Sequence, residues 1–154
     1  MAIDKVKEYF KKYNIDNRIK EFDVSSATVS EAAMALNTEE KRIAKTLSFK
    51  TKENIILVVL AGDAKISNSK YKNTFHEKAH MIPFDEVNEL IGHPVGGVCP
   101  FAVNENVIVY LDESLKRFET VFPACGSPSS AIELTIEELE KYSNYVKWVD
   151  ISTY

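Results

Sequence analysis

Lys45-Thr46-Leu47-Ser48-Phe49-Lys50 is followed by the polar residues Thr51-Lys52-Glu53-Asn54 and then by Ile55-Ile56-Leu57-Val58-Val59-Leu60. The first segment alternates polar and apolar residues, which is typical of a half-buried strand. The last segment is rich in β-branched residues and continuously apolar, as a central strand is. The four polar residues between them suit a turn. The sequence therefore predicts a β-hairpin.

Helices and further strands surround this hairpin without a strict alternation of the two. Possible capping boxes at Thr28 with Glu31 and at Thr135 with Glu138 mark two helix starts, and Gly92 suits a helix end. The interspersed pattern favours a mixed α/β (α+β) sheet over a doubly wound parallel one. The predicted helices span 3–14, 28–36, 69–75, 83–91 and 135–142, and the predicted flanking strands span 19–22, 65–67, 107–111, 119–122, 131–134 and 145–149.

The composition is that of one ordered domain over residues 1–154. Hydrophobic residues make up 45% and aromatic residues 10% of the chain, which argues against disorder. Two cysteines are too few for a disulfide scaffold and suggest a reducing compartment. No apolar run approaches the roughly 20 residues of a membrane span, and the charged N-terminus lacks a signal-peptide core. We expect a cytoplasmic protein with no membrane partner.

Charge is distributed unevenly along the chain. Residues 1–80 hold 15 lysines and arginines against 11 acidic residues, a net charge of +4, whereas residues 81–154 hold 4 against 12, a net charge of −8. Such asymmetry marks a nucleic-acid-facing side in some proteins, and in others the charges intermix on the folded surface. The acidic total argues against a DNA-coating protein. A nucleic-acid partner would meet a local patch, for which the candidates are Lys41, Arg42, Lys50, Lys52, Lys65, Lys70 and Lys72.

Glycine and proline concentrate in the loop Gly92-His93-Pro94-Val95-Gly96-Gly97-Val98-Cys99-Pro100-Phe101, which holds three of the five glycines and two of the five prolines. Consecutive amides in such a loop can bind an anion or a carbonyl oxygen, although the spacing fits neither a P-loop nor a dinucleotide fingerprint. The alternative is a structural turn. A second loop, Ala124-Cys125-Gly126-Ser127-Pro128-Ser129-Ser130, is either a binding loop or an ordinary connection.

Lys45 stands at the start of the first hairpin strand. A lysine there can stabilise a carbonyl oxygen, a phosphate or a developing oxyanion, or it can be a solvated strand-end residue. Cys99 or Cys125 could act as a nucleophile with His93, but a free cysteine is more often a small buried hydrophobe. The choice between these alternatives stays open on the residues alone.

No metal or cofactor motif is recognisable. His76 and His80 have the i, i+4 spacing of a helix face, but they lack the flanking Glu and the third ligand of a zinc site. We expect no metal and no cofactor.

The order of these motifs resembles that of the YbaK/EbsC family, relatives of the editing domain inserted in bacterial prolyl-tRNA synthetases. The resemblance covers about residue 20 to residue 142 and implies a curved, barrel-like mixed sheet with surrounding helices. The residues that carry it are Ala44-Lys45-Thr46-Leu47, Ala61-Gly62-Asp63, the 92–101 loop, Tyr110-Leu111-Asp112, and the Gly126 loop followed by Ala131-Ile132-Glu133-Leu134-Thr135.

This resemblance implies trans-editing, which is hydrolysis of the ester between a wrong amino acid and the 3′-terminal adenosine of a tRNA. The implied substrate is tRNA(Pro) carrying Cys or Ala, or another small misacylated residue, and the implied catalytic residue is Lys45. The expected partners are the acceptor end of mischarged tRNA and a helper, either prolyl-tRNA synthetase or an elongation factor. The implied substrate-binding residues are Thr46, Gly92, His93, Pro94, Gly96, Gly97, Val98, Gly126, Ser127 and Ser129.

Two hypotheses from different classes follow. In the first, the amides of Gly96, Gly97 and Val98 hold the ester carbonyl while water, a ribose hydroxyl or the substrate's own thiol attacks it. In the second, the domain is a non-catalytic module that binds aminoacyl-adenosine-like ligands or a synthetase partner.

Overall fold

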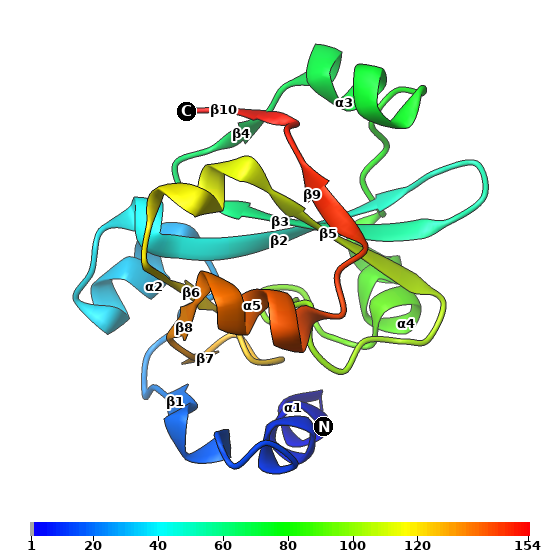
Figure 1. Cartoon of the computed structure of the whole chain (residues 1–154). Coiled ribbons are helices and arrows are strands. Elements are labelled where there is room, and N and C mark those ends of the chain that lie inside the picture. Colours follow the sequence, from blue (N-terminus) through cyan, green and yellow to red (C-terminus); the bar gives the residue numbers. More distant parts are fainter. Residues whose placement is uncertain (1) are drawn as a thin grey trace.

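The predicted hairpin is present and lies in the middle of the sheet (Figure 1). The computed structural model describes residues 2–154. Strand β2 (Ile43–Lys50) pairs antiparallel with β3 (Ile55–Ala61) in a register that places Lys45 opposite Leu60. β2 begins earlier than predicted, so Lys45 lies within the strand rather than at its first position. β3 is buried along almost its whole length, which explains its continuous apolar run.

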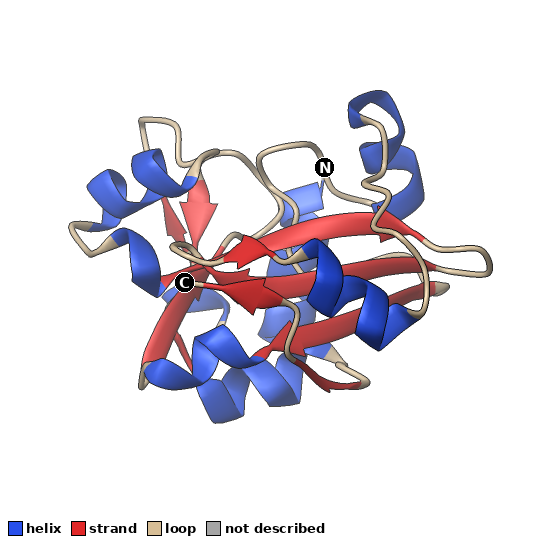
Figure 2. Cartoon of the chain, turned by 90° about the horizontal axis from the view of Figure 1, so that it is seen from above, coloured by secondary structure: helices blue, strands red, loops and turns tan. Residues whose placement is uncertain are grey.

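The hairpin belongs to a six-stranded mixed sheet in the order β8-β6-β2-β3-β5-β9. β6 (Thr120–Pro123) runs parallel to β2, and β5 (Val107–Asp112) runs parallel to β3. β9 (Lys147–Val149) extends the sheet beyond β5, and β8 (Leu134–Thr135) ends it antiparallel to β6. The strands curl, and helices surround them (Figure 2). The predicted curved, mixed sheet is confirmed.

Two pairs of very short strands lie outside this sheet. β1 (Lys20–Glu21) pairs with β7 (Ser130–Ala131), and β4 (Lys65–Ile66) pairs with β10 (Ser152–Thr153). The single strand predicted over 131–134 is therefore wrong, because its two ends belong to different sheets. The chain turns between them where the Ile132 N–H donates to the Pro123 carbonyl.

The helices begin largely where the capping signals predict. Both capping boxes form, at the start of α2 (Val29–Leu36) and at the start of α5 (Ile136–Ser143). The first helix ends before the predicted residue 14, and Asn14 has left-handed backbone angles. The other helices are α1 (Ala2–Lys11), α3 (Asn68–Phe75) and α4 (Val87–Ile91), and the 3-10 turns are η1 (Asp16–Arg18), η2 (Glu40–Arg42), η3 (Phe84–Glu86) and η4 (Glu113–Arg117).

Apolar side chains pack on both faces of the sheet. On one face Phe10 of α1 lies against Phe101, with ring centroids 4.8 Å apart. On the other face Tyr71 of α3 packs on Phe49, with centroids 5.1 Å apart. In Figure 1 these two helices lie on opposite sides of the strands. Within residues 2–154, no helix combines the length and the apolar character that a membrane crossing requires.

Candidate active site

A pocket of about 490 Å³ opens along the edge of β2 that faces away from β3. The ladder between β2 and β6 ends at the pair Ala44 and Pro123, and the next strand contact on this edge is the bridge between Phe49 and Met81. On this edge, the segment between these contacts has no neighbouring strand within residues 2–154. The β2 residues 44–48 line the pocket at this gap.

The backbone of Thr46 is directed into the gap. The Ser48 carbonyl accepts from the Ile82 N–H, and the Lys50 N–H donates to the His80 carbonyl, so the even-numbered residues of β2 turn their backbone groups away from β3. Thr46 follows the same alternation at the unpaired position. Its hydroxyl oxygen is buried without a hydrogen-bond partner in residues 2–154, so its backbone is what this residue offers to a ligand.

Lys45 is the one charged side chain on the pocket wall within residues 2–154. It is half-buried, and its Nζ donates to the Gly62 carbonyl oxygen at 3.2 Å. Burial lowers the pKa of Lys45, and the nearby Asp63 carboxylate opposes that shift. An ammonium group has three donors. One is used by Gly62, which leaves donors for a ligand carbonyl or phosphate.

The turn after β3 holds the acceptor of this lysine in place. A side chain at Gly62 would collide with the Glu40 carbonyl oxygen and crowd Val29. The carboxylate of Asp63 accepts two hydrogen bonds from Arg117, at 2.6 and 3.0 Å, and this guanidinium lowers the pKa of Asp63. Arg117 holds Asp63 in an ion pair, and Lys45 forms no ion pair within residues 2–154.

The glycine-rich loop packs against two other loops at the pocket wall. Gly96 has a φ of +88°, and a Cβ on it would lie 2.9 Å from the Cβ of Ala27. A Cβ on Gly97 would lie 2.6 Å from the backbone nitrogen of Ser127. These glycines are required because segments 95–98, 26–28 and 127–130 approach one another at backbone distance.

Residues 23–142 match the family described as the aminoacyl-tRNA editing domain, which is most of the chain. The chain belongs to this family. The editing domain is 50% identical over 152 residues to "Uncharacterized protein YwhH" of Bacillus subtilis (strain 168), and the match covers 98% of this chain and 97% of that protein. It is 28% identical over 100 residues to proline--tRNA ligase of Bacillus cytotoxicus, covering 64% of this chain and 17% of the ligase.

Solved structures agree with this assignment. The editing domain superposes with a TM-score of 0.88 and 25% identity on a crystal structure described as a candidate trans-editing enzyme for prolyl tRNA synthetase. That match covers 99% of this chain and 98% of the other. The predicted relationship to the editing domain of prolyl-tRNA synthetases is confirmed, and so is the predicted fold.

The structure brings four of the predicted site residues of the editing domain to the pocket wall, namely Lys45, Thr46, Gly96 and Val98. The amide of Gly97 already donates to the Pro94 carbonyl at 2.9 Å, whereas those of Gly96 and Val98 form no backbone hydrogen bond within residues 2–154. The remaining predicted residues are not on the wall: Gly92, His93, Pro94, Gly97, Gly126, Ser127 and Ser129.

Several of these residues have structural contacts outside the pocket wall. Gly92 ends α4 with a φ of +97°, and Gly126 packs against the backbone of Ala2. The Ser127 hydroxyl donates to the Ser130 hydroxyl at 2.9 Å, and the Ser129 N–H donates to Ser127 Oγ at 3.3 Å. Of these serines only Ser130 lines the pocket. The second loop therefore shapes the wall through Ala124 and Ser130.

His93 and Cys99 form a buried pair away from the pocket. His93 Nε2 lies 2.6 Å from the Phe101 carbonyl oxygen and 3.5 Å from Cys99 Sγ. Burial lowers the pKa of His93 and raises that of Cys99 to about 12, which disfavours a thiolate. Cys125 is also buried, with its pKa raised for the same reason. This geometry does not support a cysteine hydrolase.

His76 and His80 do not share a helix, although their spacing is that of a helix face. α3 ends at Phe75, His76 is its cap with a φ of +62°, and His80 lies beyond it. Elsewhere in residues 2–154, no three His, Cys, Asp or Glu side chains are grouped in a way that could hold a metal ion.

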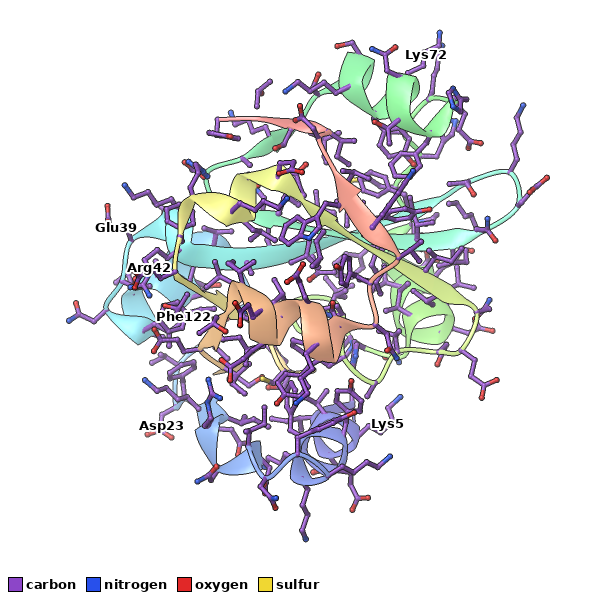
Figure 3. All side chains as sticks on the ribbon, in the orientation of Figure 1. Lys5, Asp23, Glu39, Arg42, Lys72 and Phe122 are labelled. Carbon is purple, nitrogen blue, oxygen red and sulfur yellow. The ribbon has the colours of Figure 1, made fainter. Side chains whose placement is uncertain are left out.

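The predicted basic residues do not form one patch. Lys41, Arg42, Lys50 and Lys70 are ion-paired with Glu39, Glu133, Glu86 and Asp150 respectively. Arg42 and Lys72 lie far apart in Figure 3. Lys65, by contrast, is close enough to Lys45 to lower its pKa. A role for the whole set in tRNA binding stays a prediction.

Sequence reasoning missed a large part of the wall. Ala27 and Ala32 come from the second helix and the loop before it, and Phe122 comes from β6. Met81 and Phe84 come from the segment before α4 and are 59% and 77% exposed. No motif marks these residues, because only the tertiary fold brings them together.

Proposed function

We propose that the chain is a trans-editing deacylase that hydrolyses the ester of mischarged tRNA, with tRNA(Pro) carrying Cys or Ala as its substrate. The observation that carries this proposal is Lys45, a single unneutralised ammonium on the wall of a mostly apolar pocket beside an unpaired strand edge. The family, the prolyl-tRNA ligase relatives and the structural neighbour support it.

Lys45 is the group best placed to act on the ester. In a partly desolvated pocket, an ammonium stabilises the negative charge that develops on the carbonyl oxygen more strongly than it would in water. The backbone N–H of Thr46 and the free amides of Gly96 and Val98 are further donors on this wall. Together they favour placing the carbonyl between β2 and the 95–98 loop.

The attacking group comes from outside the protein in this proposal. The wall holds no carboxylate, imidazole or thiol within residues 2–154. An aminoacyl ester is already activated, so positioning and charge stabilisation account for most of the required acceleration. The nucleophile is then a water molecule, a ribose hydroxyl of the terminal adenosine, or the thiol of a cysteinyl substrate.

Small side chains on the wall provide the size selection. Ala27, Ala32 and Ala124 leave room for a short aminoacyl group, and Ala32 lies on the buried face of α2. Excluding a bulkier cognate residue is something that such a pocket does well, because steric clash discriminates more sharply than a missing methylene.

We propose that the protein acts in the cytoplasm on the acceptor end, assisted by prolyl-tRNA synthetase or an elongation factor.

A panel of mischarged tRNAs tests the proposal. Cys- and Ala-tRNA(Pro) should be deacylated above background, and Lys45→Met should lower this activity by about 10²- to 10³-fold. Lys147→Met is the matched control, because Lys147 is exposed on β9 and does not line the pocket. Binding of a non-hydrolysable aminoacyl-adenosine analogue without hydrolysis of any tRNA would instead favour the non-catalytic module.

A further inference from the structure

Exposed apolar side chains gather at the mouth of the pocket. Phe84 is 77% exposed, Met81 59% and Val95 39%, and all three belong to the pocket wall. They come from three separate segments, namely the bridge beside β2, the turn η3 and the glycine-rich loop. We call these three side chains the apolar ledge. Packing of the core does not explain their exposure. The core contacts of this segment are made by Ile82 and Val87, which lie on either side of Phe84 in the sequence.

The backbone beneath the ledge is firmly held. Met81 forms a bridge with Phe49, and the flanking residues on both sides of Met81 hydrogen-bond to β2 at 2.8 and 3.1 Å. Two residues after Phe84, the Glu86 carboxylate accepts from Lys50 Nζ at 3.0 Å. The exposed ring of Phe84 is therefore presented by an ordered segment.

Met81 of the ledge and Lys45 lie at opposite ends of the unpaired edge. Met81 is opposite Phe49, four residues beyond Lys45 along β2, which corresponds to about 13 Å at roughly 3.3 Å per residue. A ligand whose ester carbonyl lies at Lys45 has room to extend its nucleoside along the edge toward Phe84.

We propose that the ring of Phe84 stacks on the base of the 3′-terminal nucleotide, with Met81 and Val95 flanking it. This inference rests on the proposed function, because it takes an aminoacyl-nucleoside as the ligand. A base offers a flat apolar face to an aromatic side chain, and such stacking stabilises binding without reading the base sequence. The ionic groups beside the ledge, Lys50 and Glu86, pair with each other.

The aminoacyl side chain fits the ledge less well than the base does. Phe84 is too exposed to enclose a small side chain, so it cannot select one by size. The enclosing residues are buried members of the wall, such as Ala32 and Ala131. The pocket thus divides into an enclosed part that selects the amino acid and an open part that receives the base.

Two non-hydrolysable ligands test this division. One is 3′-alanylamino-3′-deoxyadenosine, and the other is the same alanylamino ribose without a base. Phe84→Ala should weaken binding of the adenosine ligand by about 5- to 100-fold and leave the base-free ligand unchanged. Phe84→Trp, unlike Phe84→Ala, should bind the adenosine ligand about as tightly as the wild type does. Met34→Ala is the control, because Met34 is 80% exposed on α2 and does not line the pocket.

The kinetics provide an independent readout. On mischarged tRNA, Phe84→Ala should raise KM with kcat unchanged, because stacking is equal in the ground and transition states. The inference is overturned if Phe84→Ala weakens both ligands equally, if it changes neither, or if the wild type does not bind the adenosine ligand more tightly than the base-free one. Wild-type binding with the expected Phe84 effect but no hydrolysis would reject the proposed deacylase and leave the stacking intact.

Discussion

The ammonium of Lys45 donates a hydrogen bond to the backbone carbonyl of Gly62 at 3.2 Å. This bond joins the start of one hairpin strand to the turn that ends the other. The acceptor residue is packed closely against η2, because a side chain at Gly62 would collide with the Glu40 carbonyl. The position of the candidate catalytic lysine is thus determined by the packing of a turn outside the pocket.

Lys45→Met should lower the activity and raise the stability of the protein at neutral pH. Removing the Lys45 ammonium from the wall should lower kcat/KM by about 10²- to 10³-fold, the usual loss for an oxyanion donor. Burial lowers the pKa of Lys45 in the fold, so folding disfavours the charged form. This loss of stability is complete at pH values below the pKa of Lys45 in the folded protein. It disappears as the pH rises through the ordinary value of 10.5. Denaturant titrations should therefore show a variant more stable than the wild type at neutral pH, with the difference shrinking at alkaline pH.

Gly97→Ala should loosen the contact between the two loops. Its Cβ would lie 2.6 to 2.7 Å from three backbone atoms of Ser127, and overpacking of this kind costs about 1–3 kcal/mol. The melting temperature and the deacylation rate should both fall. Because the clash is with the backbone, adding Ser127→Gly should not rescue the variant. Recovery in that double variant would show that the side chain of Ser127 was responsible.

Glu138→Gln should produce a stability loss that depends on pH. Arg18 donates to both carboxylate oxygens of Glu138, at 2.7 and 3.0 Å, and lowers its pKa to about 2. A depressed carboxyl pKa contributes stability that is present above the ordinary value of 4.5 and is lost as the pH falls toward 2. Urea unfolding should show the variant to be less stable at pH 7 and equal to the wild type near pH 2.

The matched control for that experiment is Glu137→Gln, because Glu137 is exposed and forms no ion pair within residues 2–154. A constant stability gap between Glu138→Gln and the wild type at every pH would contradict the ion-pair explanation, because the hydrogen bonds from Arg18 favour the charged carboxylate and weaken when it is protonated.

Thiol reagents should leave the native protein active. Cys99 and Cys125 are buried and their pKa values are raised, so neither presents a thiolate. Cys99→Ala should keep full deacylase activity while losing some stability, because Cys99 belongs to the main core. Mass spectrometry of alkylated protein, followed by activity measurements, checks both statements. Rapid inactivation of the folded protein by thiol reagents would instead support the cysteine-hydrolase hypothesis.

The hairpin and the helix starts were predictable because their signals are local. Alternation over 45–50 and the capping boxes at Thr28 and Thr135 depend on residues within one turn or strand. The end of the β2–β6 ladder at Ala44 is not local, since it depends on where a strand from residues 120–123 stops pairing. The pocket exists because of that end, so its wall could not be derived from motifs.

Glycine-rich loops illustrate a second limit of sequence reasoning. A glycine signals close approach to its backbone but does not say what approaches. At Gly96 and Gly97 the approaching groups are other loops of the same domain, and at Gly126 the group is the first turn of α1. Composition located the loops correctly and could not separate the residues facing a ligand from those packed behind them.

The unpaired edge of β2 also affects the exchange of amide hydrogens with solvent. Neighbouring amides of the strand are protected by ladder bonds, such as that of Lys50 to His80, whereas the amide of Thr46 faces the pocket. It should exchange faster than the amides on either side and slow when a ligand fills the gap. The exchange rate of the Thr46 amide thereby reports occupancy of the pocket in the unmodified protein.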